Sequence, residues 1–193
     1  MQSLKSGLEN IHFDDWGPKD DFAIVFLNSL GTDFRVWDKL LYVLGECFRT
    51  VRVDKRGHGL STNFKNDTSI ESLAKDVSNL VDYLNLKNIC LVGLSIEGLI
   101  TLDFIKQRPN IGNKLILFDT APKIGSKEMW TDRVKRVKEG GIEAISDDIL
   151  ARRFSTSFLK YSADELQMWR SMFTNTTKSG YIGCCEAISR CDL

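Results

Sequence analysis

The stretch LVGLSIEGLI, from Leu91 to Ile100, decides the fold that this sequence predicts. It joins a buried apolar run, KNICLVGL, to a helical pattern, IEGLITLDFIKQR, through a glycine–x–serine turn. Such a sharp strand-to-helix turn presents the serine, here Ser95, at the end of a sheet. Serine is also a common helix N-cap, so the turn alone leaves both interpretations open.

Short apolar runs alternate with helical patterns around this turn. Strands are expected at residues 22–29, 48–54, 87–94 and 113–120, and helices at residues 34–45, 69–86 and 96–108. Near-continuous apolar strands between helices indicate an α/β fold, with a mostly parallel, doubly wound sheet covered on both faces. The earlier segment ENIHFDDWG is predicted to add an antiparallel edge strand, on which His12 is exposed.

After Pro122 only helical signals follow. They cover residues 126–140, 142–154, 162–173 and 179–190. We therefore expect residues 1–122 to form the amino-terminal part of a sheet core and residues 123–193 to form a helical cap.

The bulk composition excludes several classes of protein. The 193 residues have a formal net charge of zero and no basic block, so nucleic acid is not expected as a partner. No apolar run approaches the roughly 20 residues that span a bilayer, so no membrane is expected either. Five irregularly spaced cysteines and only two histidines predict no metal site. The chain opens without an apolar leader, and reduced thiols in a cytoplasmic protein are expected.

Polar turns follow the two strands that precede Ser95. In a doubly wound sheet these turns lie at the same edge as the serine. The Leu30 N–H in the first turn and the Ile96 N–H at the helix start are candidate donors of an oxyanion hole. An ordinary strand-to-helix loop is the alternative for the first turn. The second turn, DKRGHGLS, is expected to be a structural loop near the mouth of the site.

These motifs resemble a known family. RVDKRGHGLS, VGLSIEG and the strand order are similar to the α/β-hydrolase fold. FLNSLGTDFRVWD, FDTAPKIGSKEMWTDR, ARRFSTSF and GYIGCCEAISRCDL are similar to the 3-oxoadipate enol-lactonases of the β-ketoadipate pathway. The resemblance runs from about residue 22 to residue 193. It implies a carboxylic-ester hydrolase that acts on a small-molecule lactone or ester and needs no cofactor.

The same resemblance implies roles for individual residues. Ser95 matches the nucleophile, and Leu30 and Ile96 match the oxyanion donors. Trp130 and Arg133 match cap positions that would face the substrate, where the arginine would meet a carboxylate. A packed tryptophan and a solvated arginine are the alternative for this pair.

The expected partners of Ser95 are missing from the sequence. The fold supplies its triad in the order serine, acid, histidine, but His12 and His58 both precede Ser95. Asp119 ends a strand without a motif that links it to the serine. We therefore expect a chain truncated at the C-terminus, with its last strand–helix units missing and little activity of its own. An inactive fragment or pseudoenzyme and a small carboxylesterase of the same fold are the alternative functions.

Two further expectations follow from the departures from the family pattern. An uncovered apolar edge at NKLILFDT predicts self-association. Glu97 stands where the family has a small residue beside a neighbouring strand. It must find room by tilting the helix or by reaching a polar partner, or else it occupies space near Ser95 and alters the site.

Overall fold

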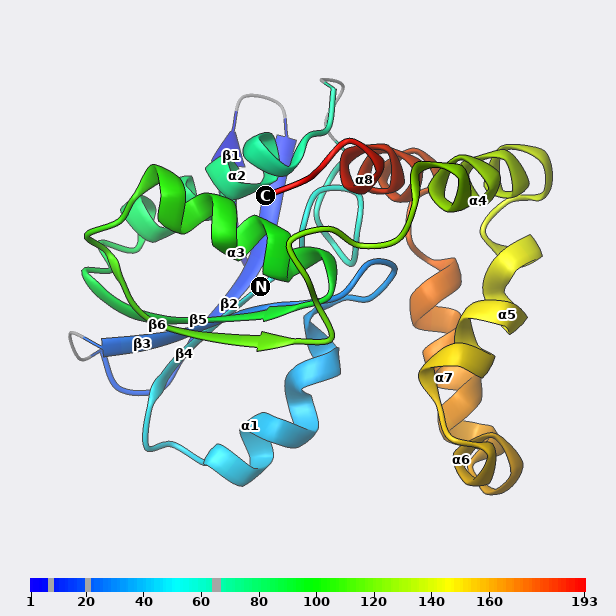
Figure 1. Cartoon of the computed structure of the whole chain (residues 1–193). Helices are drawn as coiled ribbons and strands as arrows, with labels where there is room; N and C mark the ends of the chain where they lie inside the picture. Colours follow the sequence, from blue (N-terminus) through cyan, green and yellow to red (C-terminus); the bar gives the residue numbers. More distant parts are fainter. Residues whose placement is uncertain (7–8, 20–21, 64–66) are drawn as a thin grey trace.

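The computed structural model describes residues 1–6, 9–19, 22–63 and 67–193. Six strands form one sheet in the order β1-β2-β4-β3-β5-β6 (Figure 1). They are β1 (Gln2–Ser6), β2 (Glu9–Trp16), β3 (Phe22–Leu27), β4 (Arg49–Val53), β5 (Asn88–Leu94) and β6 (Gly112–Phe118). Strands β4, β3, β5 and β6 pair in parallel, which confirms the mostly parallel sheet. Strand β2 is antiparallel to β4, as predicted, but β1 pairs outside it, so β2 is not the edge.

Helices alternate with the parallel strands and then continue alone. They are the 3-10 helix η1 (Phe34–Trp37), α1 (Asp38–Leu44), α2 (Ile70–Tyr83), α3 (Ile96–Gln107), α4 (Lys127–Gly140), α5 (Glu143–Arg153), α6 (Thr156–Tyr161), α7 (Ala163–Thr174) and α8 (Lys178–Ser189). The short helix α6 was not predicted. In the described part of the chain, no helix has the length and apolar character needed to cross a bilayer.

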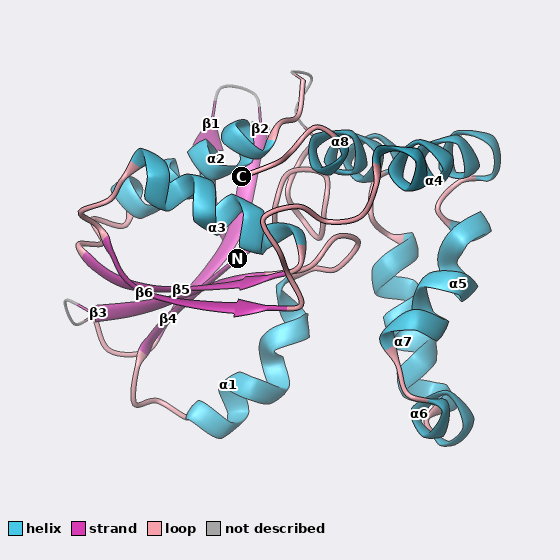
Figure 2. Cartoon of the chain, viewed as in Figure 1, coloured by secondary structure: helices cyan, strands magenta, loops and turns pink. Residues whose placement is uncertain are grey.

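The sheet is covered on both faces, as its apolar strands predict. Helices α2 and α3 pack on one face and α1 lies on the other (Figure 1, Figure 2). Side chains alternate along each strand, so Val25 joins the core under α2 and α3, whereas Phe26 packs with Trp37 on the α1 side. The parallel strands are thereby fixed with their carboxyl ends at a common edge.

Helices α4 to α8 lie beyond the carboxyl ends of the parallel strands (Figure 1). They contact one another, α4 with α8 and α5, and α7 with α5 and α6. Helix α8 docks on the polar turn after β4, where Thr177 donates two hydrogen bonds of 3.0 Å to the Gly57 carbonyl. Gly57 and Gly180 lie in close contact, since a Cβ on Gly57 would lie 2.6 Å from the Gly180 Cα. The cap and the sheet therefore meet backbone to backbone.

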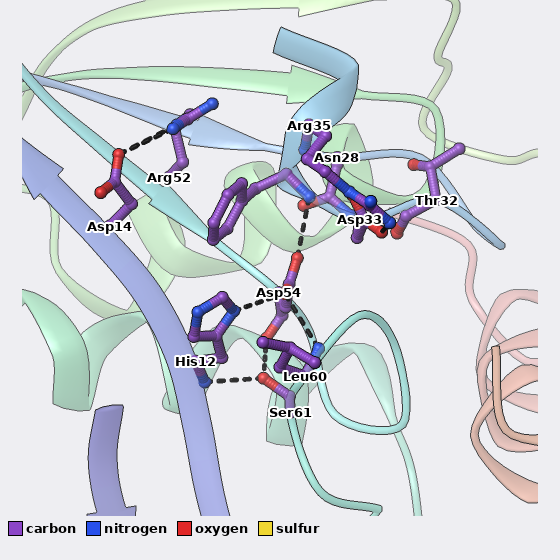
Figure 3. Close-up of polar contacts among 11 residues, drawn as sticks. His12, Asp14, Asn28, Thr32, Asp33, Arg35, Arg52, Asp54, Leu60 and Ser61 are labelled. Atoms are coloured by element: carbon purple, nitrogen blue, oxygen red, sulfur yellow. Dashed lines mark hydrogen bonds and ion pairs between the residues drawn. The ribbon is translucent and has the colours of Figure 1, made fainter. Parts of the chain in front are cut away.

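The prediction that His12 is exposed is wrong. His12 is buried, and its Nδ1 lies 2.8 Å from Asp54 Oδ2. The Asp54 carboxylate also accepts the N–H groups of Phe34 and Leu60, so it connects β2, η1 and the polar turn after β4 (Figure 3). Ser61 in the same turn accepts the His12 N–H at 2.8 Å. The Phe34 ring stacks on the His12 ring with 4.9 Å between their centroids, which covers the side that strand alternation would leave to solvent.

A buried ion pair joins β2 to β4 and gives a test of pH dependence. Asp15 Oδ2 lies 2.9 Å from Arg49 Nη2. Burial raises the pKa of Asp15, but hydrogen bonds from Arg49 and Lys19 outweigh burial and hold the pKa below its ordinary value of 3.8. Such a carboxylate contributes stability above its unfolded pKa, and that stability is lost as the pH falls through the folded pKa.

We therefore expect Asp15→Asn to lower the free energy of unfolding by about 1.5–3 kcal/mol at neutral pH. The difference from the parent should shrink as the pH falls below the ordinary pKa of 3.8 and through the lower pKa of the folded state. Urea unfolding at several pH values measures both quantities. A difference that stays constant with pH would contradict the role given to the Asp15 charge.

Candidate active site

Ser95 lies in the turn between β5 and α3, in a strained backbone conformation. Its φ of 61° and ψ of −119° fall outside the regions that residues with a side chain commonly adopt. The Ser95 N–H donates to the Phe118 carbonyl at 2.9 Å, and the Ser95 carbonyl accepts from Thr120 Oγ1 at 2.7 Å. These contacts with the end of β6 hold the strained turn in place.

Glycines on either side of Ser95 let α3 lie close to β5 and to the segment after β6. A Cβ on Gly93 would lie 2.7 Å from the Glu97 carbonyl oxygen, a backbone atom of α3. A Cβ on Gly98 would lie 2.2 Å from Thr120 Oγ1. A side chain at Gly93 would require the backbone of the turn to shift, and one at Gly98 would require the Thr120 side chain to move.

Ser95 opens onto a pocket of about 470 Å³ between the strand ends and the cap helices. This volume lies in the range of roughly 300–1,000 Å³ that is typical of small-molecule sites. The pocket brings together Ser95, Leu30, Trp130 and Arg133. Ile96 does not line it, but this buried residue begins α3, so its N–H is one of the first-turn groups without a partner inside the helix.

Trp130 and Arg133 form a stacked pair in the wall that α4 provides. Trp130 is buried and donates its Nε1–H to the Ile124 carbonyl at 2.6 Å. The Arg133 guanidinium carbon lies 4.7 Å from the centre of the Trp130 ring. The structure agrees with part of each alternative for the pair. Trp130 is packed, as the second alternative expects, but it also lines the pocket together with Arg133, as the first expects.

Arg152 and Arg153 also line the pocket, and the sequence had given neither of them a role. Arg153 donates from Nη2 to the carbonyl oxygen of Leu30, and its guanidinium carbon lies 5.4 Å from the Phe173 ring centre. Burial lowers the pKa of Arg153. The sequence signal that could have identified these two residues was an arginine pair at the carboxyl end of a predicted cap helix. With Arg133, the pocket holds three guanidinium groups.

Glu97 reaches a polar partner and does not line the pocket with Ser95. Its Oε1 lies 3.2 Å from Lys55 Nζ, and both side chains are almost fully buried. Burial raises the pKa of Glu97, and the positive charge of Lys55 opposes that shift. The Lys55 ammonium also donates to the carbonyl oxygens of Asn28 and Ser29, at 2.6 and 3.0 Å. Of the alternatives for Glu97, the polar partner is therefore the one found.

The relation of this chain to known proteins follows from its match to a family model. The model described as alpha/beta hydrolase fold matches residues 23–177. The chain belongs to the α/β-hydrolase family.

Two curated relatives and one solved structure show which members of the family this chain is similar to. The chain is 28% identical over 183 residues to 3-oxoadipate enol-lactonase 2 and 32% identical over 178 residues to 3-oxoadipate enol-lactonase 1, both of Acinetobacter baylyi. These alignments cover 95% and 92% of this chain, and 68% and 66% of the relatives. The crystal structure of the enol-lactonase from Burkholderia xenovorans LB400 superposes with a TM-score of 0.94 at 33% identity, covering all of this chain and 75% of that one. The chain thus spans about two thirds of the length of these curated relatives.

Within the described residues of this α/β-hydrolase, no histidine lines the pocket with Ser95. His12 pairs with Asp54, and His58 is fully buried with its Nδ1 3.1 Å from the Arg56 carbonyl oxygen. Burial and, after it, the charge of Lys55 lower the pKa of His58 well below its ordinary value. His58 is therefore a buried neutral residue of the turn after β4.

Three aspartates that follow Ser95 in the sequence, Asp119, Asp147 and Asp148, divide between the pocket and the cap surface. Asp119, at the end of β6, lines the pocket with Ser95. Asp147 and Asp148 do not line it, and they form ion pairs with Arg170 and Arg136 on the cap helices. No three histidine, cysteine or acidic side chains gather into a metal site in the part of the chain that the structure describes.

Proposed function

We propose that this α/β-hydrolase is an enol-lactonase that converts an enol-lactone to 3-oxoadipate, with Ser95 as the nucleophile. One observation carries the proposal: the strained serine, the Leu30 loop and the cap arginines converge on one pocket. The likeness to enol-lactonases supports the choice of substrate. In this proposal residues 1–122 are the catalytic core, and residues 123–193 are the cap that supplies the arginines.

The chemistry needs no cofactor, only the Ser95 hydroxyl, water and a proton acceptor for the serine. Ser95 Oγ attacks the lactone carbonyl carbon while its proton passes to a base, which later gives that proton to the enol oxygen that leaves. The negative charge that develops on the carbonyl oxygen is stabilised by the Leu30 and Ile96 N–H groups. The ring C–O bond then breaks, and the released enol oxygen takes a proton and tautomerises to the ketone. Water attacks the acyl group on Ser95, releases the second carboxylate of the product and restores the hydroxyl.

The charge of the substrate matches the cap. The product 3-oxoadipate has two carboxylates, and the lactone ring masks one of them, so the substrate enters with one negative charge. Arg133 is the proposed partner of that carboxylate, because a guanidinium forms two parallel hydrogen bonds to it. Its stacking on Trp130 fixes the direction from which it meets the ligand.

Arg133→Gln should therefore raise KM for the enol-lactone by about 10- to 100-fold with little change in kcat, since a hydrogen bond to a charged group is lost in substrate and transition state alike. Hydrolysis of the neutral p-nitrophenyl acetate should not change. Arg136→Gln is the control, because Arg136 lies one turn away on α4 and pairs with Asp148 outside the pocket. An equal effect of both substitutions would argue against the contact.

Hydrolysis of the enol-lactone by the purified chain at high concentration, beside Ser95→Ala, tests the proposed function. A rate above that of Ser95→Ala, and a preference for the lactone over p-nitrophenyl acetate, would support it. Turnover without such a preference favours a small carboxylesterase. A rate equal to that of Ser95→Ala, together with no labelling by a fluorophosphonate, favours an inactive fragment or pseudoenzyme.

We also infer that the chain self-associates through β6, one of the two outer strands of the described sheet. Four consecutive apolar residues of this strand, from Leu115 to Phe118, are 39–45% exposed, and an exposed apolar edge pairs readily with another chain. Light scattering should show a dimer or larger species that Ile116→Lys reduces. Leu60→Lys, at an exposed apolar residue outside β6, is the control. A monomer at every concentration would contradict the inference.

A cytoplasmic location is part of the proposal, because the five cysteines are unpaired thiols.

A further inference from the structure

A buried lysine connects the turn of Ser95 to the loop of Leu30. The Lys55 and Glu97 side chains are only 4% and 3% exposed. The Lys55 ammonium has three N–H bonds and three acceptors: Glu97 Oε1 at 3.2 Å, the Asn28 carbonyl at 2.6 Å and the Ser29 carbonyl at 3.0 Å. Glu97 belongs to the first turn of α3, directly after the serine, whereas the two carbonyls belong to the loop after β3.

The contact with Ser29 controls the direction of the proposed oxyanion donor. The Ser29 carbonyl and the Leu30 N–H belong to one planar, trans peptide group, so they point in opposite directions. A lysine that holds the carbonyl oxygen from one side therefore fixes the N–H on the other side. The next peptide group is held as well, because the Leu30 carbonyl accepts from Arg153.

We propose that Lys55 and Glu97 are positioning residues, and that together they orient the Leu30 N–H for the oxyanion that forms when Ser95 attacks. Lys55 holds the loop, and Glu97 holds Lys55. The inference rests on the proposed function for the role of Leu30. It also gives a reason for a glutamate at position 97. Its carboxylate anchors the Lys55 ammonium, which an apolar side chain at that position could not do.

The double variant Lys55→Met/Glu97→Leu separates positioning from stability. Replacing a whole buried ion pair by apolar side chains of similar size is often neutral or favourable for folding, whereas removing one partner is strongly destabilising. We expect the double variant to unfold at a urea concentration close to that of the parent. Lys55→Met alone should unfold at a lower concentration.

The decisive readout is the amide resonance of Leu30 in nitrogen-15 correlated NMR spectra. In the folded double variant it should shift or broaden, because the Ser29 carbonyl loses its donor. Asp15→Asn is the matched control, since it breaks a buried ion pair between β2 and β4 and should leave the Leu30 resonance unchanged. A Leu30 resonance that is the same in the parent and in the double variant would overturn the proposal.

A kinetic readout adds to this result where the parent shows Ser95-dependent hydrolysis of p-nitrophenyl acetate. The double variant should then lose about 10- to 100-fold in kcat with KM nearly unchanged, because an oxyanion donor acts in the transition state. If the double variant has both the stability and the kcat of the parent, then the pair has only a structural role. The Leu30 resonance can be measured in a protein that shows no turnover. A chain without lactonase activity therefore still tests this proposal, and the two failures can be distinguished.

Discussion

On its own, the 193-residue chain is expected to hydrolyse the enol-lactone at least about 10⁴-fold more slowly than a hydrolase whose serine contacts a histidine base. Serine is a weak nucleophile at neutral pH without such a base. The pocket-lining residues that the structure describes include Ser95 but no histidine. His58 is fully buried and does not line the pocket, and burial lowers its pKa and so makes it a weaker base. Steady-state rates of the purified chain and of Ser95→Ala give the comparison.

Added imidazole provides the positive control for this prediction. A small base that diffuses into the open pocket should raise the rate of the parent and leave Ser95→Ala unchanged. Such a result would mean that the pocket is arranged for hydrolysis and that the missing proton acceptor limits the rate. Fast turnover without imidazole that disappears in Ser95→Ala would contradict the prediction and require a base among the residues of this chain, with Asp119 the first to examine.

Gly57→Val is expected to lower the free energy of unfolding by about 2–6 kcal/mol, from backbone strain and overpacking together. The φ of Gly57 is +72°, and a Cβ would lie 2.6 Å from the Gly180 Cα of α8. The valine must therefore push the cap helix away from the turn after β4, which disturbs the pocket as well. Urea unfolding and Ser95 labelling measure the two effects.

Gly45→Val isolates the strain from the contact. Gly45 has a φ of +60°, but a Cβ there would have no neighbour within 4 Å. Its substitution should cost only the strain, about 1–3 kcal/mol, and leave the labelling of Ser95 unchanged. If both valine variants lose the same stability, the glycine contact between the turn and α8 contributes nothing measurable.

Hydrophobic periodicity is local, and for that reason most of the sheet was predictable. The four parallel strands and the helices between them match the predicted segments closely. Strand β1 was missed because its five residues, QSLKS, show no clear alternation and find their partner only in β2. Helix α6 was missed because its six residues are too short to show a helical period.

Tertiary contacts decided what the sequence left open in the candidate site. His12 was expected on an exposed face, but it is buried because Asp54 and Ser61 reach it from a turn far along the chain. The place of Glu97 depended in the same way on Lys55, which no local pattern connects to it. The turn geometry of Ser95, by contrast, could be predicted from a glycine–x–serine motif between a strand and a helix, because that signal is contiguous.

The stacked wall of the pocket has an optical consequence. Two of the four tryptophans, Trp130 and Trp169, line the pocket, and the Arg133 guanidinium lies 4.7 Å over the Trp130 ring. Indole fluorescence responds to the electric field at the ring, so a bound anion that draws the guanidinium aside would change the wavelength and intensity of emission. Trp37, buried under the sheet, and Trp16, exposed on β2, would contribute a constant background. The unlabelled protein thus contains its own spectroscopic reporter of ligand entry.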